Sequence, residues 1–283
     1  MLHSLAGVAE ALGFGVARSL TPVLNTQDFP AVFGGKDGKN LKSDRCGQVR
    51  ELEFIALPGT VFRVVKEIAV GKTKVLQVDT ADYQAPSGIS LYVDSRFIEQ
   101  SDVEPLPRPR KLPEATDIIS ALQAAKGAPY VWGGNAINGV PELAESYLKE
   151  SASATNSKHQ ILAGLDCSGL LYQATDGWTP RNTSQLVEFG RPVIIDGKTP
   201  AQLAALLQPL DLIVWNGHVI IVLDRKTTIE SRLICGNKGN GGVVTTPLLL
   251  RLEEIMRTRR PVDAWPGDGK KKEVFVVRRW YEH

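Results

Sequence analysis

The sequence predicts an α+β protein in which a small all-β domain precedes a larger domain of helices packed on an antiparallel sheet. Apolar and polar residues alternate in short runs over residues 31–105, whereas helical spacing and then strand-like runs occupy residues 115–283. The stretch 106–114 between them is rich in proline, which lacks an amide donor and fixes φ, so neither a helix nor a central strand can continue there. We therefore expect two domains joined by a linker.

The composition is that of an ordinary globular protein. Of 283 residues, 43% are hydrophobic and 23% are charged, and 33 basic against 31 acidic residues leave a formal charge of +2. This balance does not indicate a nucleic-acid partner, no protein partner is evident, and no apolar run reaches transmembrane length. The basic clusters 108–111 and 269–272 are expected to be solvated surface charge.

The cysteines and the N-terminus bear on the compartment. Cys46, Cys167 and Cys235 lie far apart without metal-type spacing, so we expect no disulfide framework, no metal site and no cofactor. Residues 1–30 begin with apolar residues at helical spacing and predict an N-terminal helical extension. Glu10 interrupts the apolar part and no Lys or Arg precedes it, so it makes a poor secretory signal. We expect a cytoplasmic protein, with a periplasmic or secreted one as the alternative.

The first domain is predicted to be a small barrel or sandwich. Alternating runs at 51–70, 73–86 and 88–100 predict strands, and the pair Pro58-Gly59 breaks the first of them.

The second domain begins with helices. Thr116 is a capping-type residue at the start of a helix that runs to Gly127, and residues 167–175 predict a helix that starts at or beside Cys167. Residues 136–163 are polar and predict a surface insertion with one central helix.

An antiparallel sheet follows. Two apolar runs within 211–224 are joined by Asn216-Gly217, a strong hairpin signal, and 227–236 predicts a third strand. A helix and a final strand complete the chain.

Cys167 is a candidate nucleophile. A thiol attacks as thiolate, which a helix N-terminus and a nearby imidazole both favour. Of the four histidines, His3 and His283 lie near the termini and His159 lies in the polar insertion. His218 opens an apolar strand and is therefore the candidate base.

A Cys–His pair also needs a group that orients the imidazole. Glu230 follows His218 in the next predicted strand, and if the two strands are antiparallel neighbours its carboxylate can reach the second ring nitrogen. The alternative is a strand-edge glutamate in water.

Three sequence blocks, in order, resemble a known family. "GAPYVWGGN" (127–135), "DCSGLLY" (166–172) and "LDLIVWNGHVIIVLD" (210–224) are similar to the NlpC-like, papain-fold cysteine peptidases that cut cell-wall peptides, and a polar residue, Glu230, follows about a dozen positions after the histidine. The resemblance covers roughly residues 115–265. It implies a papain-like domain whose Cys167 is the nucleophile, His218 the general base and Glu230 the orienting residue.

The resemblance also implies substrate contacts. Tyr130 matches a tyrosine beside the scissile carbonyl, and Asp166 and Ser168 match a pair that binds the substrate's free amine. The full set of implied substrate-binding residues is Tyr130, Trp132, Asp166, Ser168, Arg181, Ser184 and Gln185.

The chain departs from the family pattern at three places. Glu230 stands where most relatives have histidine, asparagine or glutamine, the insertion 136–163 is longer than usual, and Leu210 replaces a glycine. The first departure bears on the orienting residue, the second on one wall of the cleft and the third on local geometry.

The first domain resembles the bacterial SH3-like domains that precede the catalytic domain in peptidases specific for γ-D-glutamyl–diaminopimelate bonds. In those enzymes the small barrel closes one end of the cleft, so that only peptides with a free N-terminal L-Ala fit. Contributors from this domain would be Glu51, Glu53, Tyr83 and Tyr92.

The resemblance thus implies an endopeptidase that hydrolyses the γ-D-glutamyl–meso-diaminopimelate bond of peptidoglycan-derived tri- or tetrapeptides, in cell-wall peptide recycling or turnover. An amidase or acyltransferase on the same Cys–His site and a non-catalytic wall-binding protein are the alternatives. A redox sensor is disfavoured because no resolving cysteine lies near Cys167 in the sequence.

Overall fold

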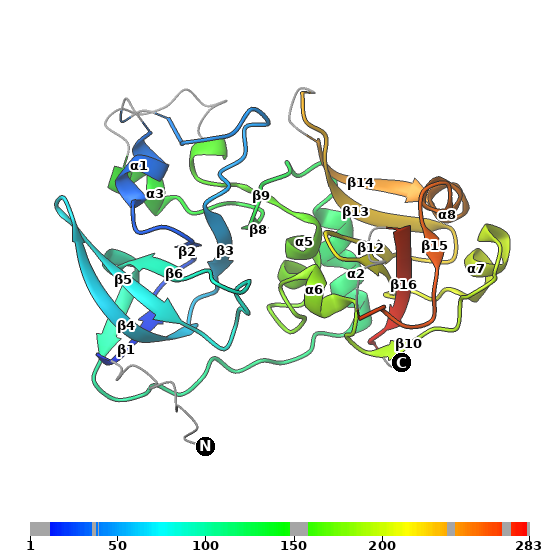
Figure 1. Cartoon of the computed structure of the whole chain (residues 1–283), viewed down its shortest axis with the longest axis horizontal. Helices are drawn as coiled ribbons and strands as arrows, with labels where there is room; N and C mark the ends of the chain where they lie inside the picture. The colour runs from blue at the N-terminus through cyan, green and yellow to red at the C-terminus, as the bar shows by residue number, and fades with distance from the viewer. Residues whose placement is uncertain are drawn as a thin grey trace, which may run out of the picture.

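The computed structural model describes residues 12–35, 38, 40–147, 158–236, 241–267 and 273–281. They form two lobes, each built on its own antiparallel sheet (Figure 1). The strands of the first sheet are β1 (Phe14–Ala17), β2 (Thr21–Leu24), β3 (Leu52–Ala56), β4 (Val61–Val70), β5 (Thr73–Asp79), β6 (Leu91–Asp94) and β7 (Ile98–Ser101). Their order is β3-β2-β6-β5-β4-β1-β7. The expected run 51–70 is two strands separated by a turn at Pro58-Gly59, as predicted.

The segment expected to be a helical extension contributes two strands instead. β1 pairs with both β4 and β7, and β2 pairs with β3 and β6, so residues 14–24 lie inside the first sheet. Helical spacing over so short an apolar segment does not exclude a strand, and the neighbouring strands supply its backbone hydrogen bonds. Residues 1–11, including His3, lie outside the described part of the chain.

The second lobe is built on the second sheet. Its strands are β10 (Arg191–Pro192), β11 (Leu212–Trp215), β12 (His218–Val222), β13 (Thr227–Leu233), β14 (Gly241–Pro247), β15 (Arg260–Pro261) and β16 (Val274–Arg279). The order is β10-β16-β11-β12-β13-β14, and β15 pairs with β16 in parallel. Trp215 lies opposite His218 across the turn, so the hairpin predicted at Asn216-Gly217 is confirmed. β12 and β13 are antiparallel neighbours, which is the arrangement that lets the Glu230 carboxylate reach the His218 ring.

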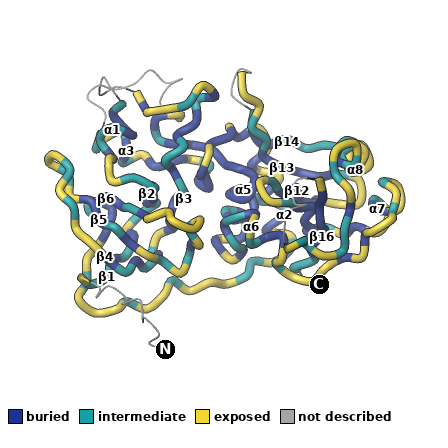
Figure 2. Tube along the Cα trace, viewed as in Figure 1, coloured by how far each residue is buried: buried dark blue, intermediate teal, exposed yellow. Residues whose placement is uncertain are grey.

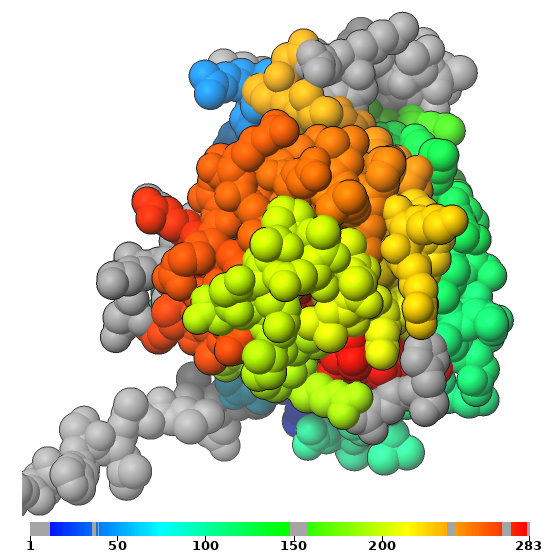
Figure 3. Space-filling model, turned by 90° about the vertical axis from the view of Figure 1, so that its right-hand side faces the viewer, coloured from blue at the N-terminus to red at the C-terminus, as the bar shows by residue number. Residues whose placement is uncertain are grey.

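Helices pack on and beside the two sheets. They are α1 (Phe29–Gly34), the 3₁₀ turn η1 (Ser95–Phe97), α2 (Ala115–Ala124), α3 (Glu142–Tyr147), α5 (Cys167–Ala174), α6 (Thr183–Leu186), α7 (Pro200–Leu206) and α8 (Leu248–Met256). Glu114 is the N-cap of α2, so Thr116 lies inside the helix and is not its cap. α7 and α8 cover the outer end of the second lobe (Figure 3). None of the described helices is long and apolar enough to cross a membrane.

The insertion 136–163 is more than a polar surface segment. Val140, Leu143 and Leu162 are buried in one apolar cluster with Phe29 and Phe33 of the first lobe. A two-stranded sheet, β8 (Asn135–Ala136) and β9 (Gly164–Leu165), brackets this insertion, and residues 148–157 lie outside the described part. The described ends of the insertion therefore help to join the two lobes.

The linker also makes specific contacts, contrary to the expectation of solvated charge. Arg108 donates to the Asp176 carboxylate at 3.1 Å and to the Asp176 carbonyl at 2.8 Å, and its side chain is only 11% exposed. Arg110 pairs with Asp82 of the first lobe. The second basic cluster, 269–272, lies outside the described residues.

Both lobes have buried cores, and buried residues also connect them. Figure 2 shows a continuous buried region that runs from the first sheet through β8 and β9 to α5. At the junction, the Asn135 side chain accepts from the Ile55 N–H at 3.0 Å and donates to the Ile55 carbonyl at 2.8 Å. Asn135 thus serves the backbone of β3 as a neighbouring strand would.

We expected no disulfide, but two of the three cysteines are bonded to each other. Cys46 of the first lobe and Cys235, just after β13, form a disulfide across 189 residues, and Cys167 alone is free. Spacing could not reveal this pair because only the folded chain brings the two lobes together. The finding removes the support that unpaired cysteines lent to a cytoplasmic location.

We expect the Cys46→Ser/Cys235→Ser double variant to lose about 2–4 kcal/mol of unfolding free energy, because the disulfide closes a long loop in the unfolded chain. Urea unfolding under non-reducing conditions measures the change. Unfolding of the wild type in reductant is the control and should match the variant. An unchanged midpoint in the double variant would contradict the prediction.

Candidate active site

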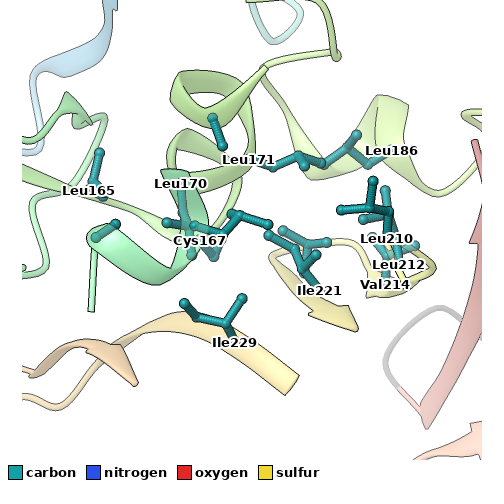
Figure 4. Close-up of a cluster of buried hydrophobic side chains, with 14 of the residues drawn as sticks. Leu165, Cys167, Leu170, Leu171, Leu186, Leu210, Leu212, Val214, Ile221 and Ile229 are labelled. Carbon is teal, nitrogen blue, oxygen red and sulfur yellow. The ribbon is translucent and has the colours of Figure 1, made fainter. Parts of the chain in front are cut away.

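Cys167 is the first residue of α5, and Asp166 is its N-cap. The cysteine is 8% exposed and belongs to the apolar cluster that includes Leu165, Ile221 and Ile229 (Figure 4). The N–H groups of the first helical turn have no intrahelical acceptors, so they can donate to a negatively charged group held at this end of α5. The helix start was predicted at this residue and is confirmed.

His218 reaches the cysteine from the tip of the β11–β12 hairpin. The turn is held by Thr183 of α6, whose hydroxyl accepts from the Gly217 N–H at 2.9 Å. The imidazole packs against the Trp215 ring, with centroids 5.1 Å apart. The Cys167 Sγ lies 3.9 Å from the carbonyl oxygen of Gly217, the residue before His218, and the thiol contributes to the raised pKa of the imidazole. Sequence reasoning missed Thr183, which lies within the "PRNTSQ" segment already singled out.

Glu230 completes a line of three groups. It lies on β13 with a fully buried side chain, and its Oε2 lies 2.6 Å from the His218 Nε2. Because Nε2 is engaged there, Nδ1 is the nitrogen left to face the Cys167 thiol. The strand-edge glutamate in water is therefore not what the structure shows.

Two arginines that the sequence did not single out hold Glu230. Arg251 of α8 donates through Nε at 2.7 Å and through Nη2 at 3.0 Å, and Arg232 lies 2.9 Å from the same carboxylate. A buried carboxylate needs such compensation, since an unpaired charge would be costly there. No local pattern indicates Arg251, because it comes from a different element.

These contacts shift both pKa values in favour of an ion pair. Burial lowers the pKa of His218, but the hydrogen bonds and negative charges of Cys167 and Glu230 outweigh it and raise that pKa to about 9. Burial raises the pKa of Glu230, whereas His218 and Arg251 lower it more, to about 2. Protonated His218 stabilises the folded state at pH values below the pKa of an unfolded histidine, and this contribution is lost as the pH rises through about 9. Ionised Glu230 stabilises the folded state at pH values above the pKa of an unfolded glutamate, and this contribution is lost as the pH falls through about 2.

We expect the Glu230→Gln variant to lose turnover by about 10²-fold or more, because the imidazolium loses its anionic partner. The alkaline limb of kcat/KM, set near pH 9 by His218 in the wild type, should move down toward neutrality. A pH profile from 5 to 10 tests this shift.

Glu254→Gln is the matched control for that profile. Glu254 also pairs with Arg251, at 3.0 Å, but it lies on α8 and is not the carboxylate that pairs with His218. Its alkaline limb should stay in place. A Glu230→Gln profile with the wild-type limb would remove Glu230 from the catalytic group.

Tyr130 interacts electrostatically with the candidate nucleophile Cys167. It is 9% exposed, and burial together with the negative charges of Asp166 and Cys167 raises its pKa, while Arg181 and Arg50 lower it. The hydroxyl therefore stays protonated at neutral pH and can donate a hydrogen bond. This agrees with a place beside a developing oxyanion.

The Asp166 carboxylate has hydrogen-bond partners within the protein that the sequence did not indicate. Its Oδ1 accepts from the Gly169 N–H at 2.6 Å and from Arg181 Nη1 at 3.0 Å, and its Oδ2 accepts from Arg181 Nη2 at 2.6 Å. Arg181 also donates to the Ser168 hydroxyl at 2.9 Å. The expected role of Asp166 and Ser168 at a substrate amine would thus have to compete with a buried arginine.

The other expected substrate contacts are partly exposed. Trp132 is 39% exposed, and Ser184 is exposed on α6. Gln185 and Arg181 line a cavity of about 540 Å³ together with Tyr83 of the first lobe. Arg181 itself is 2% exposed, so it forms the floor of this cavity more than its open wall.

The first-lobe candidates divide into two groups. Glu53 and Tyr83 are linked by a 2.7 Å hydrogen bond from the Tyr83 hydroxyl, and Tyr83 stacks on Phe54. Glu51 pairs with Lys42 at 2.5 Å, and Tyr92 packs against the apolar cluster of the first lobe. Of these four residues, only Tyr83 lines the cavity that contains Arg181.

The remaining histidines lie elsewhere. His159 is exposed, and its Nε2 lies 2.8 Å from the Gly47 carbonyl. His283, like His3, lies outside the described part. Among the described residues, no three His, Cys, Asp or Glu side chains are grouped so as to hold a metal ion.

Leu210, which replaces a family glycine, has φ of 67° in the left-handed region. Its side chain is nevertheless 1% exposed within the core of the second lobe. The backbone strain of a non-glycine residue is thus accompanied by apolar burial.

No family model matches the chain, and no curated protein matches it. Solved structures that match the chain include NlpC/P60 family proteins. A protein of this family from Bacillus cereus ATCC 10987 is 16% identical with a TM-score of 0.33, over 94% of this chain and 63% of the other, so this chain spans less than two thirds of that protein.

Two further solved structures are similar. RipD from Mycobacterium tuberculosis, described as a non-catalytic NlpC/p60 domain protein adapted to peptidoglycan binding, is 20% identical with a TM-score of 0.29, over 47% of this chain and 92% of that one. NlpC2 from Trichomonas vaginalis is 10% identical with a TM-score of 0.36, over 98% and 100%. Likeness of this size assigns no activity to this chain.

Proposed function

We propose that the protein is a cysteine peptidase that hydrolyses the γ-D-glutamyl–meso-diaminopimelate bond of peptidoglycan-derived peptides with a free N-terminal L-Ala. The observation that carries the proposal is the assembly of Cys167, His218 and Glu230 from a helix start and two neighbouring strands. The resemblance of the sequence blocks around these residues to NlpC-like peptidases supplies the substrate class.

The Cys167 thiolate attacks the γ-glutamyl carbonyl carbon and forms a tetrahedral intermediate. The backbone N–H at the start of α5 and the Tyr130 hydroxyl donate to its oxyanion. His218 passes its proton to the diaminopimelate nitrogen, the C–N bond breaks and a thioester remains. His218 then takes a proton from water, the hydroxide attacks the thioester, and the acid and the thiol are released.

Glu230 supports each proton transfer. Its carboxylate keeps the imidazole orientation constant and stabilises the imidazolium. Arg251 and Arg232 balance the buried negative charge, so that Glu230 stays ionised whether His218 is charged or neutral.

The first lobe supplies the proposed requirement for a free N-terminus. Tyr83 lines the same cavity as Arg181 and Gln185, so the first lobe forms one wall of a space next to Arg181, the ion-pair partner of Asp166. The Cys46–Cys235 disulfide favours the periplasmic or secreted alternative over the cytoplasm, because disulfides persist in oxidising compartments. Turnover of wall peptides outside the cytoplasm is part of the proposal.

The decisive assay incubates the protein with L-Ala-γ-D-Glu-meso-diaminopimelate and detects L-Ala-γ-D-Glu and free diaminopimelate by mass spectrometry. The N-acetylated peptide is expected to react more slowly. Absence of both products from protein whose Cys167 reacts with iodoacetamide would contradict the proposed bond. Cleavage of an N-acetylmuramoyl peptide at its amide instead would indicate the amidase.

A further inference from the structure

The side chain of Arg50, in the first lobe, lies over the ring of Trp132, which follows Tyr130 closely in the chain. The guanidinium carbon of Arg50 is 4.4 Å from the centroid of the Trp132 ring. Trp132 lies two residues after Tyr130, and both the Arg50 side chain and Trp132 are 39% exposed. The stacked pair therefore leaves part of the Arg50 guanidinium, which also pairs with Asp44 at 2.6 Å, open to solvent.

The loop that carries Arg50 is held in place by polar contacts. Asp44 accepts from the N–H groups of Cys46 at 2.7 Å and Gln48 at 2.9 Å, and its Oδ2 accepts from Arg50 Nε at 2.6 Å. Gln48 accepts in turn from the Trp132 N–H at 2.8 Å. A hydrogen bond thus connects this loop to the chain segment that contains Tyr130 and Trp132.

The disulfide adds a covalent fastening, because Cys46 in this loop is bonded to Cys235 of the second lobe. Little conformational freedom is therefore left for Arg50 to lose on binding a ligand. The guanidinium is pre-organised over Trp132.

Arg50 keeps donors for a ligand. A guanidinium has five N–H donors, and the side-chain contact of Arg50 among the described residues uses Nε alone. The other arginines near the site form ion pairs with buried carboxylates: Arg181 pairs with Asp166, and Arg251 and Arg232 pair with Glu230. Two Nη groups in one plane match the two oxygens of a carboxylate.

The position is electrostatically linked to the reaction centre. The charge of Arg50 acts on the Tyr130 hydroxyl, whose pKa it lowers, and Tyr130 also responds to Cys167. Because the Arg50 guanidinium lies over Trp132, two residues after Tyr130, an anion bound at Arg50 would belong to a substrate residue close to the scissile bond. A γ-linked glutamyl residue has such an anion, because its α-carboxylate is not used in the peptide bond.

We propose that Arg50, stacked on Trp132, is a specificity-determining residue that binds the free α-carboxylate of the γ-linked glutamyl residue and selects against its α-amidated form. The inference rests on the proposed function, whose substrate it narrows. An isoglutaminyl residue has a neutral amide at this place, which offers one acceptor and no charge to the guanidinium.

The test compares L-Ala-γ-D-Glu-meso-diaminopimelate with the peptide whose glutamyl α-carboxylate is an amide. Wild-type protein should cleave the acid with a kcat/KM at least about 10-fold higher. Arg50→Gln should lose about 10- to 100-fold on the acid, mainly through KM, and change little on the amide. Arg50→Lys should retain part of the preference, since it keeps the charge and loses the planar fork.

Arg45→Gln is the matched control. Arg45 is exposed in the same loop, so the variant removes the same charge without touching Trp132. Its preference should equal that of the wild type. An equal fall of Arg50→Gln on both peptides, or a wild type without preference, would overturn the inference.

Calorimetry with the Cys167→Ala protein separates this inference from the proposed function. Binding of the acid peptide should be tighter than that of the amide, and Arg50→Gln should remove the difference. If wild type cleaves neither peptide while this difference in binding persists, the proposed reaction fails and the carboxylate site stands. Equal binding of both peptides would overturn the site even if cleavage occurs.

Discussion

Cys167→Ala is expected to lower the rate of peptide cleavage by about four to six orders of magnitude, because the group that forms the covalent bond is removed and the rest of the triad acts only through it. The residual rate would come from the oxyanion donors and from substrate binding. A quenched-flow or long-incubation assay on the γ-D-glutamyl peptide measures the loss.

The thiol replacement has two controls. The Cys167 side chain is small and 8% exposed, so the melting temperature should change little, and near-wild-type unfolding shows that the loss is chemical. Cys167→Ser keeps the size but offers a weaker nucleophile, and it should be nearly as inactive. Substantial cleavage by either variant would show that Cys167 is not the nucleophile.

Arg181→Leu is expected to cost about 3–5 kcal/mol of unfolding free energy, because it leaves the Asp166 carboxylate buried without its cation. Arg181 is 2% exposed and also donates to Asn135 at 3.2 Å, so the variant disturbs both the start of α5 and the junction of the lobes. Turnover should fall as well, since Asp166 is the N-cap of the helix that begins at Cys167. Denaturant unfolding and steady-state kinetics measure the two effects.

The ion pair between Arg110 and Asp82 provides the comparison. Its arginine is 37% exposed, so Arg110→Leu should cost no more than about 1 kcal/mol. The double variant Arg181→Leu/Asp166→Asn should be more stable than Arg181→Leu alone, because the unpaired charge is gone. A cost for Arg181→Leu as small as that of Arg110→Leu would contradict the buried-pair account.

Local pattern was sufficient for the elements that carry the triad. Asn216-Gly217 marked the hairpin that presents His218, and the run after Asp166 marked the helix that begins at Cys167. Glu230 followed from the pairing of β12 with β13, which short connections between strands favour. These inferences depend on residues close together in the chain, where spacing and turn chemistry act directly.

Contacts between distant segments could not be predicted in this way. Arg251 reaches Glu230 from another element, and Arg181 neutralises the carboxylate that we expected at a substrate amine. Within the segment that suggested an N-terminal helix, residues 14–17 form β1 instead, because β4 and β7 lie on either side of it. The local pattern allowed both conformations, and packing selected one.

The sequence by itself therefore indicated most elements of the second lobe and the candidate nucleophile and base, because periodicity and turn residues act over a few positions. Only the tertiary structure decided which charges are paired, that Cys46 joins Cys235, and that Arg50 of one lobe lies on Trp132 of the other. Such partners are far apart in the chain, and their free energy depends on burial and distance, which exist only once both lobes have packed together.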